Sequence, residues 1–305
     1  MAPGAVFVLR IDFFMVILIF FCTNNRQFPL PFMQKIDKTL IVSCHLNLLT
    51  SQQSRTTMKN VLVIGTRRRL DEFRNVKLEN ATISYLDQFY LEMDQMDLPI
   101  EEMEKPQDEY YIDQVNIATY DIVFDLALDE HPENLDHYVG NVNQVVIGGA
   151  VKITLAQMVA ESGYELECKL FGMNALPSFL DRAVFEMSIL APEDSQLLAK
   201  TMQELGREFE LVDDRIGMVT PRIVCMIINE ACFVLKEGTA EIADVDQAMK
   251  LGTNYPHGPF EWADLMGLHN VYDVVKALRE DTGEEKYKMA PLLKQYYYRE
   301  QNFYS

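Results

Sequence analysis

The amino-acid sequence predicts an α/β domain built on a mainly parallel sheet, followed by an all-α domain. Short apolar runs alternate with stretches of helical spacing up to about residue 212, which is typical of parallel strands connected by helices. Beyond that point apolar residues recur only at helical spacing, so no further strand is expected. A chain of 305 residues is long enough for two compact domains.

Five short apolar runs are predicted to be buried strands, because each is brief and is bounded by polar residues or glycine. They occupy residues 61–64, 81–86, 120–125, 144–148 and 185–190. The first run ends at Gly65 and the second at Asp87, so the segment from 61 to 87 predicts a β-α-β unit. A further apolar run at 209–212 is the last before the pattern changes.

The remaining regular elements are predicted to be helices. Leu198, Met202 and Leu205 share one helical face, and a long apolar helix is expected from Pro221 to Lys236. Glycines mark the predicted helix ends, at Gly206, Gly238, Gly252 and Gly267. The boundary between the two domains is expected near residues 213–217, which divides the body of the chain into 58–214 and 215–305.

The first 57 residues differ from the rest of the chain. They show no clear periodicity and carry five basic and two acidic residues. The apolar run at 13–22 is too short to span a bilayer comfortably, and no small-residue cleavage site follows it. Because Met58 begins a run that resembles a natural protein start, we expect residues 1–57 to be an extraneous or unstructured extension.

The charge and the cysteines restrict the class of protein. A formal net charge of −19 argues against binding to nucleic acid or to an anionic membrane surface, since both require basic patches. The acidic excess is concentrated between Asp87 and Gly140, where Lys105 is the single basic residue. The five cysteines and five histidines show no metal-ligand or disulfide spacing, which favours a metal-free protein of the reducing cytoplasm.

Four motifs in the second half resemble those of one enzyme family. They are Asn229-Glu230-Ala231, the segment Asp246–Gly252, the segment Pro256–Asp264, and the segment Tyr287–Leu293. This pattern is similar to the carboxyl-terminal domain of the 3-hydroxyacyl-CoA dehydrogenase (3-hydroxybutyryl-CoA dehydrogenase) family. The resemblance implies a Rossmann-like first domain, NAD as cofactor, an acyl-CoA substrate, a homodimer, and NAD-dependent oxidation of L-3-hydroxyacyl-CoA in fatty-acid metabolism.

The resemblance assigns three residues to the cofactor site. Dinucleotide-binding domains carry G-x-G-x-x-G after the first strand and an acidic residue about 20 residues later. Here that loop is the segment 65–70, in which Gly65 keeps the first glycine, while Arg67 and Leu70 replace the second and third. Asp87 takes the place of the acid. Alternatively, the arginines at 67–69 bind a phosphate or a partner's carboxylates, or form a solvated face.

The resemblance also assigns two catalytic positions. In the family a histidine acts as the base and a glutamate orients it; these correspond to Asn174 and Glu186. An amide cannot take a proton near neutral pH, so Asn174 predicts that the base is lost. Two functions therefore stay open. One is a dehydrogenase, and the other is a non-catalytic acyl-CoA-binding or dimeric interaction protein of the same fold.

Overall fold

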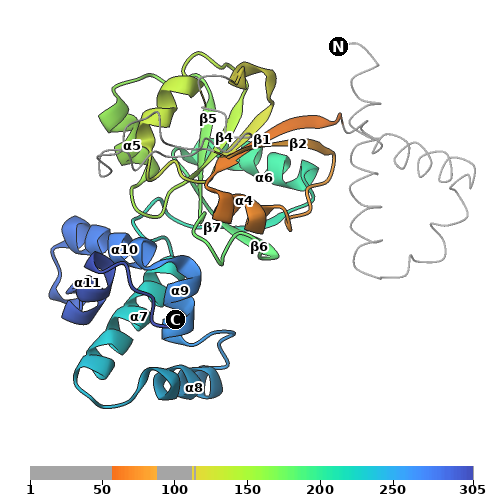
Figure 1. The fold of residues 1–305 in the computed structure, drawn as a ribbon. Helices are drawn as coiled ribbons and strands as arrows, with labels where there is room; N and C mark the ends of the chain where they lie inside the picture. Colours follow the sequence, from red (N-terminus) through yellow and green to blue (C-terminus); the bar gives the residue numbers. More distant parts are fainter. Residues whose placement is uncertain (1–56, 88–111, 113–114, 305) are drawn as a thin grey trace, which may run out of the picture. The chain divides into compact units, whose positions relative to one another are not determined.

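A computed structural model describes residues 57–87, 112 and 115–304. Within these residues, seven strands form one sheet in the order β2-β1-β3-β4-β5-β6-β7 (Figure 1). Neighbouring strands are parallel except for the antiparallel pair of β5 and β6. The strands are β1 (Lys59–Gly65), β2 (Ala81–Asp87), β3 (Ile122–Asp125), β4 (Val145–Gly149), β5 (Lys169–Met173), β6 (Val184–Ile189) and β7 (Glu208–Leu211). The predicted mainly parallel sheet followed by helices is confirmed.

Strand β5 is the element that the sequence pattern did not predict. Its apolar run is interrupted by Gly172, which weakens the strand signal. The glycine is required by close packing, because a Cβ atom there would lie 2.3 Å from Ser188 Oγ and 2.8 Å from the Ala150 Cβ. The antiparallel neighbour and the preceding loop therefore approach β5 more closely than a side chain would permit.

Each face of the sheet has its own apolar core. Helices α4 (Arg67–Phe73) and α6 (Ser195–Glu204) cover one face, where Leu70, Phe73 and Leu198 are fully buried (Figure 1). Helix α5 (Leu155–Ser162) covers the other face, together with short 3-10 helices. Those are η3 (Ile117–Thr119) and η4 (Pro132–Tyr138), while η5 (Pro192–Asp194) precedes α6 and η6 (Glu285–Tyr287) lies near the carboxyl end.

Five α-helices follow the sheet. They are α7 (Thr220–Lys236), α8 (Ile242–Thr253), α9 (Pro259–Met266), α10 (Leu268–Thr282) and α11 (Pro291–Tyr298). The predicted long helix at 221–236 is confirmed, and α9 ends beside Gly267, whose φ of 86° suits a residue without a side chain. No helix in the described residues is long and apolar enough to cross a membrane. The expectation for residues 1–57 lies almost wholly outside the described residues.

Buried polar side chains from two of the four sequence motifs hold the helices together. Asp246 on α8 accepts hydrogen bonds from the backbone N–H groups of Phe260 (2.8 Å) and Glu261 (2.9 Å) and from the Tyr304 hydroxyl (2.7 Å). Asn229 on α7 donates to the Lys288 carbonyl (2.9 Å) and accepts from the amide of Ala290. These contacts satisfy the amides at a helix start and pin the chain before α11.

Asp264 completes this framework at the end of the chain. Its carboxylate accepts from the backbone amides of Phe303 (2.9 Å) and Tyr304 (2.8 Å). Gly258, in the same motif, leaves no room for a side chain, because a Cβ there would lie 2.3 Å from Asp246. Asn229, Asp246 and Asp264, which belong to the motifs of the second half, therefore have structural roles as helix caps and tethers.

A buried carboxyl group at the end of β3 predicts a pH dependence of stability. Burial raises the pKa of Asp125 to about 6, although Tyr138, Asn134 and the Ala127 amide donate hydrogen bonds to it. Because the folded-state pKa lies above the ordinary value of 3.8, this group's stabilisation is complete below about pH 4 and is lost as pH rises through about 6.

We therefore expect Asp125→Asn to remove this loss. Between pH 4 and pH 7, the free energy of unfolding of the variant should rise relative to that of the unmodified chain by about 2 kcal/mol. Urea unfolding at the two pH values measures the difference, and Asp121→Asn, before the same strand and exposed, is the matched control. A pH-independent difference between Asp125→Asn and the unmodified chain would contradict the assignment.

Candidate functional site

The predicted cofactor residues lie together at the carboxyl end of the first two strands. Gly65 and Asp87 are paired in the register of β1 and β2, and α4 begins two residues after the glycine. Arg67 Nε donates to Asp87 Oδ2 at 2.9 Å. Gly65, Arg67 and Asp87 are thus brought together, with Arg67 and Asp87 joined as an ion pair.

The other residues of this loop are engaged with the protein itself. Leu70 is fully buried in the core between α4 and the sheet. Arg68 donates to the carbonyl oxygens of Asp264 (2.9 Å) and Leu265, in the last turn of α9. Arg69 is 2% exposed, and its guanidinium binds the Glu130 carboxylate with two hydrogen bonds of 2.8 and 2.7 Å. Arg69 was one of the arginines expected to bind a phosphate or a partner's carboxylate. In the structure it binds a carboxylate of its own chain, Glu130.

Arg69 and Glu130 belong to a longer series of charges, which we call the ion chain: Arg69, Glu130, Lys152 and Asp273. Lys152 Nζ lies 2.6 Å from Glu130 Oε1 and 3.0 Å from Asp273 Oδ2. Burial alone raises the pKa of Glu130, but the hydrogen bonds and charges of Arg69 and Lys152 outweigh burial and hold that pKa well below its ordinary value. Burial opposes the charge on Lys152, yet the nearby carboxylates, Glu130 first, raise its pKa. Glu130 and Lys152 are therefore both charged near neutral pH.

Sequence reasoning did not identify the ion chain. Glu130 follows β3 and Lys152 follows β4, and parallel neighbouring strands bring their carboxyl ends to one edge of the sheet. That edge is where α/β proteins place functional side chains, so a charged residue just after each predicted strand was the available signal. Asp273, the partner of Lys152 on α10, gave no such signal because it lies 121 residues from Lys152 in the sequence.

Asn174 is buried directly after β5. Its backbone N–H donates to the Glu186 carbonyl at 3.0 Å, so the two predicted catalytic residues are neighbours across β5 and β6. The Asn174 side-chain oxygen accepts from the amide of Leu176 at 3.3 Å, two residues ahead. This local turn keeps the amide side chain within its own loop.

The Glu186 carboxylate caps the first helix of the second half. It accepts from the backbone N–H groups of Val219 and Thr220, and both of its oxygens lie within 3.2 Å of the Thr220 nitrogen. An acidic side chain at a helix start satisfies free amides and stabilises the positive end of the helix dipole. The geometry thus gives Glu186 a structural contact in place of an imidazole partner.

The loop after Asn174 is held from both sides. Glu72 on α4 accepts from the amides of Ser178 (2.7 Å) and Leu180 (2.8 Å), and Trp262 Nε1 of α9 donates to Ser178 Oγ at 3.1 Å. Ser178 has a φ of 73°, in the left-handed region that favours glycine. Phe179 stacks on Trp262 with ring centroids 5.9 Å apart. Helix α4 and helix α9 therefore position this loop together.

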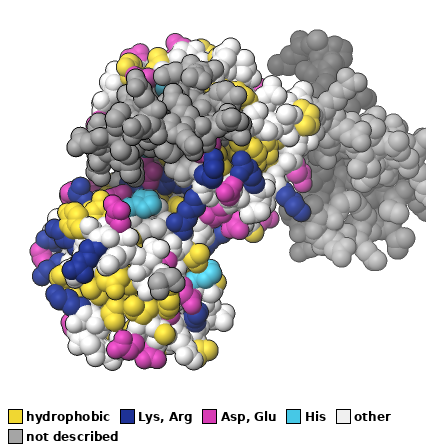
Figure 2. Space-filling model, in the orientation of Figure 1, with side chains coloured by type: hydrophobic (Ala, Val, Ile, Leu, Met, Phe, Trp, Pro, Cys, Tyr) yellow, Lys and Arg dark blue, Asp and Glu magenta, His cyan; other side chains and the backbone are white. Residues whose placement is uncertain are grey.

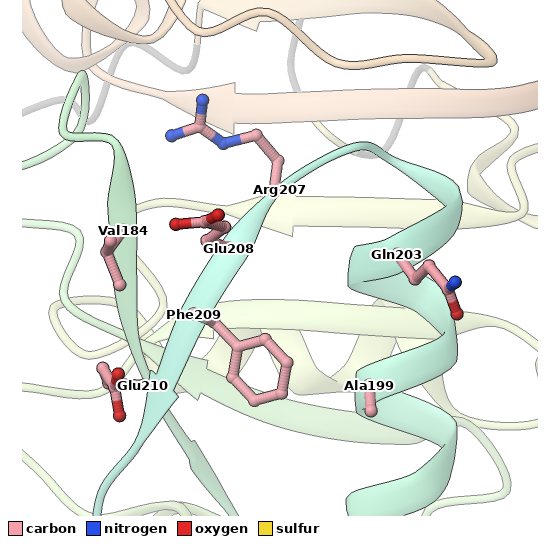
Figure 3. Close-up of a pocket in the computed structure, with 7 residues that line it drawn as sticks. All are labelled: Val184, Ala199, Gln203, Arg207, Glu208, Phe209 and Glu210. Carbon is pink, nitrogen blue, oxygen red and sulfur yellow. The ribbon is translucent and has the colours of Figure 1, made fainter. Parts of the chain in front are cut away.

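Two cavities lie away from these residues. One, of about 420 Å³, lies between α6, strand β6 and the edge strand β7; it is lined by Val184, Ala199, Gln203, Arg207, Glu208, Phe209 and Glu210 (Figure 3). Another, of about 510 Å³, is lined by His257, Glu261, Asp264, Leu265 and Tyr304. Neither cavity is lined by Gly65, Arg67, Asp87, Asn174 or Glu186.

Nucleophilic thiol and metal chemistry receive no support from the described residues. Burial raises the pKa of Cys168 to about 11 and that of Cys232 to about 12, and it raises the pKa of Cys225 further. These thiols stay protonated near neutral pH and are poor nucleophiles. In the part of the chain that the structure describes, no group of three His, Cys, Asp or Glu side chains is placed to hold a metal ion.

Comparison with known sequences identifies relatives of the helical half. Residues 217–302 match the family model described as 3-hydroxyacyl-CoA dehydrogenase, C-terminal domain. A 3-hydroxyadipyl-CoA dehydrogenase of Escherichia coli K12 is 39% identical over 94 residues, covering 31% of this chain and 20% of that protein. A 3-hydroxybutyryl-CoA dehydrogenase of Bradyrhizobium diazoefficiens is 35% identical over 116 residues, covering 38% of this chain and 36% of the relative. The chain therefore matches well under half the length of either relative.

Comparison with solved structures extends the likeness to the sheet. The (S)-3-hydroxybutyryl-CoA dehydrogenase of Ralstonia eutropha has a TM-score of 0.54 at 21% identity, covering 80% of this chain and 95% of that chain. FadB2 of M. tuberculosis has a TM-score of 0.57 at 18% identity, covering 82% and 99%. At these identities the likeness shows the fold alone. The fold is shared over most of the chain, whereas the family model matches the helical half.

Proposed function

We propose that the chain is a member of the 3-hydroxyacyl-CoA dehydrogenase family, whose C-terminal domain model matches residues 217–302, and that it binds an acyl-CoA without carrying out the family's NAD-dependent oxidation. The proposal rests on the hydrogen-bond partners of the two residues at the family's catalytic positions. Asn174 directs its amide oxygen to the amide of Leu176, and Glu186 is engaged by the amides that start α7. No proton acceptor stands at the base position, and loss of a general base lowers a rate by about 10² to 10⁴.

The residues of the predicted NAD site do not fit the dinucleotide. The pyrophosphate of a dinucleotide approaches the backbone at the second glycine of the loop, a position that Arg67 occupies here. Asp87, the acid that would accept from the adenosine ribose, already accepts from Arg67 at 2.9 Å. Arg67 and Asp87, on the two sides of the predicted site, are thus paired with each other. This arrangement supports the part of the proposal in which the chain does not use NAD.

We also propose a homodimer formed through the helical half. Figure 2 shows hydrophobic side chains grouped on the face of this half that is turned to the viewer. Val219 and Ile223 lie one helical turn apart at the start of α7, and each is 50% exposed, while Leu251 on α8 is 78% exposed. Exposed apolar side chains at adjacent turns favour association. A monomer by light scattering would contradict this part of the proposal.

The three buried free thiols support a reducing, cytoplasmic location.

Calorimetry and a turnover assay on the full-length chain test the function. We expect acetoacetyl-CoA to give a saturable binding heat, and NADH oxidation in the presence of acetoacetyl-CoA to stay at the level of buffer alone. Absence of a binding heat would remove the acyl-CoA part of the proposal. NADH oxidation dependent on acetoacetyl-CoA would instead establish the alternative, an active L-3-hydroxyacyl-CoA dehydrogenase.

A further inference from the structure

The ion chain connects four separate elements across the junction of the sheet and the helical half. Arg69 comes from α4, Glu130 from the loop after β3, Lys152 from the loop after β4, and Asp273 from α10. The charges alternate in sign along the series and sum to zero. The link between Lys152 and Asp273 is the step that crosses from the sheet to the helices.

We propose that the ion chain is an internal latch, which keeps α10 seated against the carboxyl edge of the sheet. Side chains at this edge ordinarily face a ligand in α/β proteins. Here they face one another. The proposal concerns how the two halves are held together, so it does not depend on whether an acyl-CoA is bound.

The ion pairs among Arg69, Glu130 and Lys152 are more buried than the pair between Lys152 and Asp273. Side-chain exposure is 2% for Arg69, 8% for Lys152 and 19% for Glu130, but 38% for Asp273. A buried charge without a partner is strongly unfavourable, so Glu130 and its two cations are expected to stay paired in every folded state. Asp273 is exposed enough to exchange Lys152 for water. The weakest link is therefore the one between the two halves.

A second contact from the same helix supports the latch. Arg68, next to Arg69 on α4, donates to the carbonyl oxygens at the end of α9, just before α10 begins. A cation at that point also interacts favourably with the negative end of the α9 dipole. Two successive arginines in the first turn of α4, Arg68 and Arg69, thus face the helical half and the ion chain.

Hydrogen–deuterium exchange on three full-length variants tests the latch. Asp273→Asn removes the charge, Asp273→Glu keeps it, and Glu280→Gln is the control, since Glu280 forms an exposed pair with Lys276 on the same helix. We expect Asp273→Asn to speed exchange about fivefold to tenfold in residues 268–275 and, by the same factor, in the loops 126–131 and 150–153. Asp273→Glu and Glu280→Gln should exchange like the unmodified chain.

The exchange rates of the loops 126–131 and 150–153, on the sheet side of the ion chain, distinguish the latch from a local effect. Faster exchange confined to α10 would show a local effect on the helix and would overturn the latch. Equal exchange in Asp273→Asn and Glu280→Gln would also overturn it. If Asp273→Glu opened both sides as much as Asp273→Asn, the shape of the side chain rather than its charge would be responsible, and the ionic latch would be wrong. None of these readouts uses acyl-CoA, so they are independent of the proposed function.

Discussion

Replacing Asp246 with alanine is expected to lower the free energy of unfolding by about 3 kcal/mol, because three donors lose their acceptor together. The amides of Phe260 and Glu261 start α9, and the Tyr304 hydroxyl secures the carboxyl end of the chain. Asp246 is 1% exposed, so water cannot readily take its place. Urea unfolding followed by circular dichroism measures the change.

The matched control for this prediction is Asp244→Ala on the same helix. Asp244 is exposed in the first turn of α8, where a carboxylate contributes about 0.3 to 1 kcal/mol through the helix dipole. A loss from Asp246→Ala no larger than that from Asp244→Ala would contradict the role of Asp246 as the cap of α9.

Replacing Arg69 with methionine is expected to lower the free energy of unfolding by about 3 kcal/mol, which is the lower end of the range for breaking a buried ion pair. The loss stays near that end because Lys152 still contacts Glu130 at 2.6 Å. Arg69 also donates to the Ala175 carbonyl at 3.1 Å, so the substitution removes this hydrogen bond as well. Urea unfolding at neutral pH measures the loss.

Arg67→Met two residues earlier is the control for that measurement. The Arg67 side chain is 65% exposed and its pair with Asp87 lies at the surface, where ion pairs contribute at most about 1 kcal/mol. The double substitution Arg69→Met with Glu130→Leu should recover part of the loss, since it also removes the Glu130 carboxylate, which in the single variant has lost one of its two cations. Equal effects of Arg69→Met and Arg67→Met would refute the assignment of Arg69 as the buried anchor of the ion chain.

The fold was predictable because burial leaves a local record in the sequence. The run 61–64 is apolar at every position, and the structure buries all four residues in the sheet. Strand β5 left a weaker record, since the side chain missing at Gly172 is explained by the packing of Ser188, which lies 16 residues away. The helix ends were readable because positive φ angles favour glycine, as at Gly206 and Gly267.

The candidate site was predictable in position but not in its contacts. Gly65, Arg67 and Asp87 were placed together by the β-α-β pattern, and the structure places them so. The partners of Glu186 are backbone N–H groups, which every residue except proline carries, so no residue type could indicate them. The ion chain depends on which loops meet at one edge of the sheet, and that follows from the strand order rather than from local sequence.

A fluorescence titration of NADH into the full-length chain tests the central claim most directly, because it probes the loop of Gly65 and Arg67 without requiring the correct acyl-CoA. We expect no saturable change in NADH fluorescence up to millimolar concentrations, since Arg67 and Asp87 satisfy each other where the dinucleotide would lie. Saturable binding in the micromolar range would contradict this account and would favour an active dehydrogenase.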